Sequence, residues 1–145
     1  MEIKKIGFAC DHAGYQMKEH VKALIQKWMP EVELVDFGTH SEESVDYPDF
    51  AHQLGEAIDK GELAWGVAVC GSANGISMTL NKHANVRAAI CWCEEIAELA
   101  RLHNDANVMS LPGRFLTEAE GEVIARKFFT TEFEGGRHQR RVNKI

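Results

Sequence analysis

The 145-residue sequence has no long apolar run and only four cysteines. No stretch approaches the roughly 20 consecutive apolar residues of a membrane-spanning helix, and the N-terminal MEIKKIGFAC lacks the apolar segment of a signal peptide. We therefore expect a cytoplasmic protein with no membrane partner. Four cysteines are too few for a disulfide framework in a chain of this length, so we expect free thiols.

Positively charged residues are outnumbered by acidic ones, and the net charge is −6. Because binding to a nucleic-acid backbone needs a basic face, we expect no nucleic-acid partner. The exception is local, in GGRHQRRVNK near the C-terminus. Arg137 and Arg141 would face the same side of a helical turn, which suits a small phosphate group, and Arg114 would add to them. A solvated chain end is the alternative.

The length and the composition, 45% apolar and 26% charged, are typical of one globular domain, residues 1–145. Within it, the tail 134–145 carries the basic cluster. We expect strands at Ile6–Cys10, Val32–Gly38, Trp65–Cys70, Val86–Trp92 and Asn107–Leu111. A helix should follow each strand, and a T-x-x-E capping box at Thr117 and Glu120 marks the last one. This alternation predicts an α/β fold, a three-layer sandwich with a five-stranded parallel sheet and helices on both faces.

In such a sheet, ligands bind beyond the carboxyl ends of the strands. The loop there after Cys70, in CGSANGISM, has no bulky side chain from Gly71 to Gly75. Its N–H groups can approach a ligand closely, and it leads into a helix N-terminus, which favours negative charge. The spacing matches neither G-x-G-x-x-G nor a P-loop, so a nucleotide is not indicated. We predict an anion site at this loop.

The cysteine suggests an anion that forms during a reaction. A thiol at a helix N-terminus can have its pKa lowered from about 8.5, which would make Cys70 a base or a nucleophile. Removing a proton next to a carbonyl creates an enediolate, which each preorganised N–H donor would stabilise by roughly 3–4 kcal/mol. The alternative is that Cys70 is a small buried apolar residue and that the glycines form a tight turn.

Asp11 and His12 follow the first strand, and His103 and Asn104 end the fourth helix. Asp11 is either a hydrogen-bond acceptor or base, or the N-cap of the next helix, and His12 suits a phosphate or hydroxyl ligand. His103 and Asn104 have the residue types of an ordinary helix C-terminus.

A zinc site is not indicated. Cys91 and Cys93 have no second pair of ligands in the sequence. The other histidines, His138 among them, have no metal-ligand spacing, and we assign them to the surface or to packing.

Five motifs, in order, resemble the ribose-5-phosphate isomerase B family, which also includes galactose-6-phosphate isomerase subunits. They are CDHAGYQMKEH, DYPDFA, CGSANGISMTLNKH, RLHNDANV and EGGRHQRRV. The resemblance runs from about Ile3 to Val142. It implies a Rossmann-like aldose–ketose isomerase that needs no metal and no cofactor. It also implies a phosphorylated sugar as substrate and a homodimer or a dimer of dimers.

The resemblance also implies a role for each matching residue. Cys70 would be the base that moves a proton between C1 and C2, and Ser72 would assist transfer between the oxygens. His103, helped by Asp11, would open the furanose ring. The loop backbone would hold the enediolate, through Gly71, Ser72, Ala73, Asn74 and Gly75. The other matching residues would bind the phosphate (His12, Arg137 and Arg141) or the sugar (Asn104, Arg114 and Tyr47).

Two positions in the loop after Cys70 differ among members of the family and show which members this chain resembles. Many members have glycine where this chain has Ala73, so we expect a slightly different loop shape. Members that lack the cysteine use a glutamate further along the loop, at or beside the position of Ile76. Since isoleucine cannot take a proton, this chain resembles the cysteine type.

The topology adds a prediction of its own. His103 ends a helix that leads into the fifth strand, so it should lie at the amino edge of the sheet, away from Cys70. We therefore expect an active site shared between two subunits. The expected reaction interconverts ribose 5-phosphate and ribulose 5-phosphate. The alternatives are an isomerase of a hexose 6-phosphate, of the allose or galactose type, and a non-catalytic sugar-phosphate binding module.

Overall fold

The structure, a computed structural model, describes all residues from Met1 to Ile145. Strands and helices alternate as β1 (Lys5–Cys10), α1 (Tyr15–Trp28), β2 (Glu33–Asp36), α2 (Tyr47–Asp59), β3 (Trp65–Cys70), α3 (Asn74–Leu80), β4 (Ala88–Ile90), α4 (Glu94–Leu102), β5 (Val108–Pro112), α5 (Glu118–Thr130) and α6 (Arg137–Val142). The predicted α/β alternation is confirmed. The tail contains a sixth helix, α6, where the sequence indicated only a helical turn.

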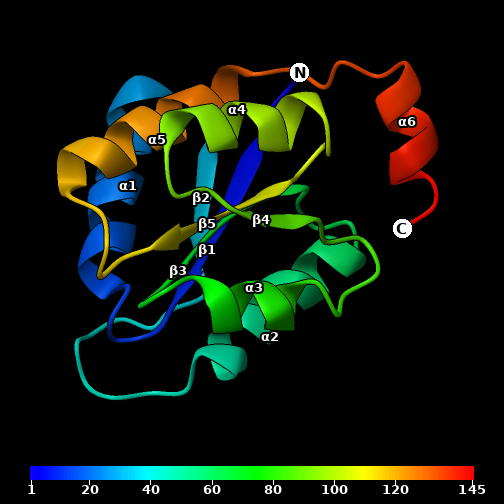
Figure 1. Cartoon of the computed structure of the whole chain (residues 1–145). Helices are drawn as coiled ribbons and strands as arrows, with labels where there is room; N and C mark the ends of the chain where they lie inside the picture. Colours follow the sequence, from blue (N-terminus) through cyan, green and yellow to red (C-terminus); the bar gives the residue numbers. More distant parts are fainter.

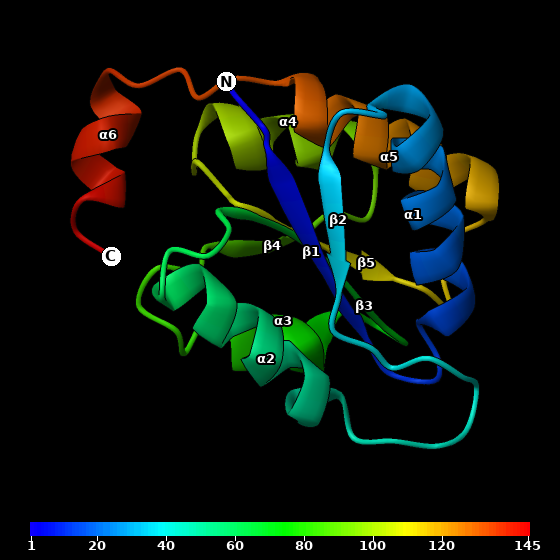
Figure 2. The same cartoon turned by 180° about the vertical axis from the view of Figure 1, so that it is seen from behind.

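The five strands form one parallel sheet in the order β2-β1-β3-β5-β4. One face packs against α1, α4 and α5 and the other against α2 and α3, so the molecule has three layers (Figure 1). Seen from behind, β1 crosses the middle of the sheet between the two helical layers (Figure 2). The central strands are buried on both faces, which explains their nearly continuous apolar sequences.

The edge strands are shorter than the sequence suggested. β2 spans Glu33–Asp36 instead of Val32–Gly38, and β4 spans Ala88–Ile90 instead of Val86–Trp92. Each pairs with one neighbour only, so fewer backbone hydrogen bonds hold its ends in the sheet. The capping box of α5 is present as predicted: Thr117 Oγ1 accepts from Glu120 N, and the Glu120 carboxylate accepts from Thr117 N.

A buried lysine joins the first helix to the carboxyl edge of the sheet. Lys18 is fully buried, and its Nζ lies 2.8 and 2.9 Å from the Asp36 carboxylate oxygens and donates to Thr39 O at 2.6 Å. Lys22, which is partly exposed, binds the same carboxylate at 2.8 Å. Burial raises the pKa of Asp36, but the hydrogen bonds from the two lysines outweigh it and hold that pKa below its ordinary value. Asp36 therefore stays charged and fixes the loop after β2.

None of the helices combines the length and the apolar character that a membrane crossing requires.

We expect Lys18→Met to lower the free energy of unfolding by about 3 kcal/mol, because it leaves a mostly buried carboxylate with Lys22 as its one cationic partner, beside the hydrogen bond from Gly38 N. The matched control Lys22→Met removes an equally short but partly exposed contact and should cost less than about 1 kcal/mol. Since the folded pKa of Asp36 is lowered, the stabilisation is present above its ordinary pKa and lost as pH falls through the folded pKa. Urea unfolding of both variants between acidic and neutral pH measures this, and equal losses would contradict it.

Candidate functional site

The central crevice of the sheet lies between β1 and β3. The chain leaves β1 for β2 on one side and returns to β3 on the other, so the loops after β1 and β3 diverge at this point. Cys10 pairs with Val69 in the register, which sets the turn after Cys10 beside the end of β3. Such a switch point is where open α/β sheets bind ligands, and the predicted loops do meet at this edge.

The loop after β1 folds tightly against β3. Asp11 N donates to Val69 O at 3.2 Å, and Asp11 Oδ1 accepts from Gly14 N at 3.0 Å. A side chain on Gly14 would overlap the Val69 carbonyl, so only glycine permits this approach. The N-cap of α1 is Gly14, not Asp11 as one reading of the sequence had it. Asp11 closes the turn through Oδ1 only, and Oδ2 has no hydrogen bond within the chain.

His12 is oriented by the segment before α2. Its Nδ1 accepts from Val45 N at 3.1 Å, so in the neutral ring the proton lies on Nε2 and can be donated to an anion. His12 and Arg114 line one cavity of about 350 Å³. The other lining residues are Ala13, Gln16, Met17, Glu42, Gly113, Leu116 and Glu118. Two residues expected to bind substrate therefore face the same space.

The loop after β3 presents free backbone donors. The N–H groups of Gly71, Ser72 and Ala73 have no acceptor within the chain. Ala73 has φ 68°, a conformation that favours glycine, and its side chain is buried. Ser72 Oγ accepts from Asn74 N at 3.3 Å, just where α3 begins. The loop thus holds several unpaired N–H groups close together, as the sequence predicts.

Two of the predicted substrate-binding side chains pack on this loop. The Tyr47 ring lies against Gly75, where a larger residue would overlap it. The Arg114 side chain lies beside Gly71, with Cδ and Nη1 each 3.3 Å from where a Cβ would be. The contact with Tyr47 explains the glycine at position 75, whereas at Gly71 a Cβ would be tight but not excluded.

Three of the four cysteines are buried, and burial raises the thiol pKa of two of them. Cys70 ends β3 and is 4% exposed, packed against the cluster of α2 and α3. Cys10, at the end of the neighbouring strand, is fully buried, and burial raises the pKa of its thiol to about 12. Burial also raises the pKa of Cys91 to about 12. Neither Cys10 nor Cys91 can supply a thiolate near neutral pH.

The remaining predicted residues lie at the opposite, amino edge of the sheet. His103 caps the C-terminus of α4, the Asn104 carbonyl accepts from the Arg87 guanidinium, and Arg137 and Arg141 are exposed on α6. In Figure 1, α6 lies on the far side of the sheet from the end of β3. A strand of this length separates the two edges by roughly 16 Å. A single chain therefore does not bring His103 to Cys70.

His103 has a neighbour that the sequence did not indicate. Its ring stacks on that of His138, with centroids 4.1 Å apart and planes at 12°. Glu134 faces both rings, 4.0 Å from His103 Nε2 and 3.8 Å from His138 Nε2. The sequence predicts a surface or packing role for His138, and the ring is indeed buried and packed. The sequence does not predict that it packs on His103, because the two histidines are far apart and no spacing rule links them.

This cluster is the one set of side chains grouped as metal ligands would be, with ligand atoms within 4.8 Å of one another. Metal-bound imidazoles place the ion close to the plane of each ring. Two nearly parallel rings, stacked face to face, cannot both do so with one ion. The arrangement fits ring stacking better than a metal site.

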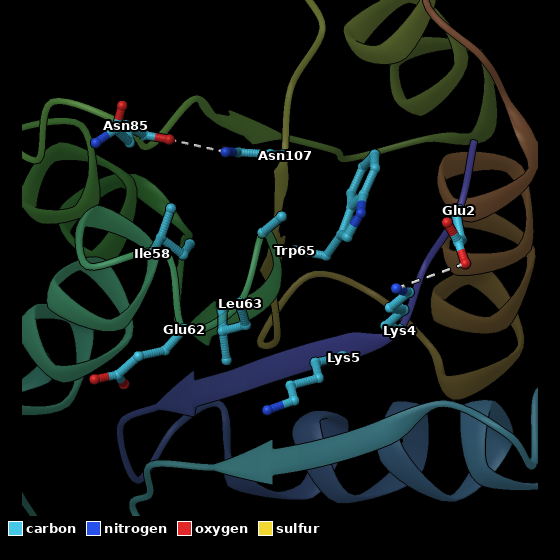
Figure 3. Close-up of a pocket in the computed structure, with 11 residues that line it drawn as sticks. Glu2, Lys4, Lys5, Ile58, Glu62, Leu63, Trp65, Asn85 and Asn107 are labelled. Atoms are coloured by element: carbon cyan, nitrogen blue, oxygen red, sulfur yellow. Dashed lines mark hydrogen bonds and ion pairs between the residues drawn. The ribbon is translucent and has the colours of Figure 1, made fainter.

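A larger hollow, of about 500 Å³, lies at the amino edge near Lys5, Ile58, Leu63 and Trp65 (Figure 3). Lys4, which also lines it, pairs weakly with Glu2. None of the residues predicted for the site lines this hollow.

Comparison with known proteins places the chain in a family. A family model described as Ribose/Galactose Isomerase matches residues 6–145. Ribose-5-phosphate isomerase B of Escherichia coli is 40% identical over 99% of this chain and 95% of its own length. The crystal structure of a ribose 5-phosphate isomerase from Thermotoga maritima is 41% identical, has a TM-score of 0.92, and matches over 99% of this chain and 97% of that one.

A further solved structure contains a ligand. It is ribose-5-phosphate isomerase B from Mycoplasma genitalium with bound ribulose-5-phosphate, 36% identical, with a TM-score of 0.92 over 99% of this chain and 95% of that chain. The family model and these relatives each match nearly the whole chain, on the fold described above. The chain therefore belongs to the ribose/galactose isomerase family, within the ribose-5-phosphate isomerase B group, and is an isomerase.

Proposed function

We infer that this isomerase interconverts ribose 5-phosphate and ribulose 5-phosphate. The ribulose-5-phosphate bound to the Mycoplasma genitalium relative supports this substrate. The observation that carries the mechanism is the position of Cys70, next to a loop whose N–H groups at Gly71, Ser72 and Ala73 are unpaired.

In the proposed mechanism the Cys70 thiolate removes the proton from C2 of the open-chain aldose. The electron pair of that C–H bond forms the C1–C2 double bond, and the carbonyl oxygen becomes an enediolate oxygen. The free N–H groups of the loop stabilise that negative charge, which is larger in the transition state than in the substrate. Ser72 assists proton transfer between O1 and O2, and the Cys70 thiol then returns its proton to C1.

Ring opening precedes this step. Asp11, with a free Oδ2, and His103 act on the hemiacetal, one accepting the hydroxyl proton and the other protonating the ring oxygen. His12, Arg137 and Arg141 bind the phosphate, since Nε2 of His12 is a donor and two guanidiniums provide paired donors. Tyr47, Arg114 and Asn104 line the sugar site.

These residues form one site only if a second subunit takes part. Cys70, Asp11 and His12 lie at one edge of the sheet, and the group of His103, Asn104, Arg137 and Arg141 lies at the other. We propose a homodimer, alone or paired into a dimer of dimers, in which the partner supplies this second group. Met78 on α3 and Trp92 after β4 are large apolar side chains that are 68% and 58% exposed, and we propose that the partner subunit covers them.

We expect Cys70→Ala to reduce turnover of ribose 5-phosphate by about 10²–10⁴-fold, because a base in the transition state is lost. The assay follows ketose formation and deuterium incorporation at C2 in D2O. Cys93→Ala is the matched control, a partly exposed thiol outside the proposed site, and should keep full activity. Unchanged exchange in Cys70→Ala would remove this thiol from the mechanism. A parallel series with allose 6-phosphate and galactose 6-phosphate ranks the substrates.

Mixing two inactive variants tests the shared site. Cys70→Ala and His103→Asn should each be inactive alone, but subunit exchange yields hybrid dimers with one intact site and one doubly altered site. About one quarter of all sites should then be active in an equal mixture, as two-fold symmetry requires. No recovery, with hybrids verified by mass spectrometry, would mean that both residues act within one chain.

A further inference from the structure

We propose that His138 is a positioning residue for His103, and that its ring holds the imidazole of His103 in orientation by face-to-face stacking. The proposal rests on the proposed function of His103 in opening the furanose ring. His138 itself is not placed at the reacting atoms. It acts through the neighbouring ring.

The segment that carries His138 is fixed to the end of α4. Glu134 N donates to Leu102 O at 3.1 Å, which ties this segment to the last turn before His103. His138 N donates to Gly135 O at 3.1 Å, and His138 lies in the first turn of α6. His138 is 5% exposed although α6 is otherwise exposed on nearly every residue. The one buried side chain of this helix is therefore the one that packs on His103.

The ring of His138 has no competing hydrogen bond. Its Nε2 is buried and has no hydrogen-bond partner, and the Glu134 oxygen at 3.8 Å is too distant to accept from it. A buried nitrogen without a partner costs free energy, so a histidine at this position needs an explanation. We explain it by the stacking at 4.1 Å, which uses the face of the ring and not its nitrogens.

The surroundings of His138 disfavour the charged form of its ring. Burial lowers the pKa of His138, and the charges of His103, Arg137 and Arg141 lower it further, while Glu134 has the opposite effect. These causes together favour the neutral form of the His138 ring, so the stack is not weakened by repulsion between two cationic rings.

Stacking suits a ring that must exchange protons. A hydrogen-bond partner on Nδ1 or Nε2 would occupy one of the atoms that His103 uses, and no group of the chain forms such a bond with either nitrogen. Glu134 is 4.0 Å from His103 Nε2, which is too far for a hydrogen bond. His103 is thus oriented while both its nitrogens stay available.

The test compares two reactions of the same dimer. Turnover of ribose 5-phosphate needs ring opening. Deuterium exchange into C1 of ribulose 5-phosphate does not, because this ketose carries phosphate on O5 and cannot close a furanose ring. We expect His138→Ala to slow turnover of ribose 5-phosphate by about 10–100-fold and to leave the exchange within about twofold of wild type.

The conservative variant His138→Phe keeps a flat ring without nitrogens and should restore most of the turnover. Gln139→Ala, an exposed neighbour on α6, is the control and should match wild type. Equal losses in both reactions, or no loss in either, would overturn the positioning role. If His138→Phe is as slow as His138→Ala, the nitrogens matter and the stacking proposal fails. Absence of both reactions in the wild-type protein would instead refute the proposed function.

Discussion

The parallel pairing of β1 with β3 is the constraint on which the functional edge of this molecule depends. The pairing brings the turn after Cys10 against the last residues of β3, and the approach is close enough that Gly14 has no room for a side chain. Asp11 and the Cys70 loop become neighbours through backbone geometry alone. The chemistry of the site follows from this placement, because an acidic turn and a set of free N–H groups then border one crevice.

Much of the structure at the carboxyl edge of the sheet can be predicted from the sequence, because the parallel topology determines it. A strand followed by a crossover helix must end at the same edge as its neighbours, so the loops at Cys10 and Cys70 were predictable from apolar patterning. The capping box at Thr117 is equally local, since its two partners lie one helical turn apart. Buried Lys18 was not predictable in this way, because its partner Asp36 comes from another element and a lysine in an amphipathic helix is usually exposed.

At the opposite, amino edge of the sheet, the sequence alone predicts less of the structure. The position of His103 follows from topology, since α4 must return to the amino edge before β5 begins. The stacking of His103 on His138 does not follow from topology. The conformation of residues 131–136 determines where α6 lies, and that segment has no periodic pattern from which its structure could be predicted. The roles of residues came from the resemblance, and local chemistry alone left Asp11, His103 and Asn104 as ordinary turn and helix-end residues.

The left-handed conformation of Ala73 has a consequence for the free energy of binding. A glycine at this position would visit many backbone conformations, whereas the methyl group of alanine, enclosed by its surroundings, permits few. Holding a non-glycine residue there costs about 1–3 kcal/mol, which the rest of the fold must offset. In return the conformation of the loop that holds the free N–H groups of Gly71, Ser72 and Ala73 is restricted in advance. Under the proposed function, little conformational entropy would then remain to be lost when an anion binds to these groups.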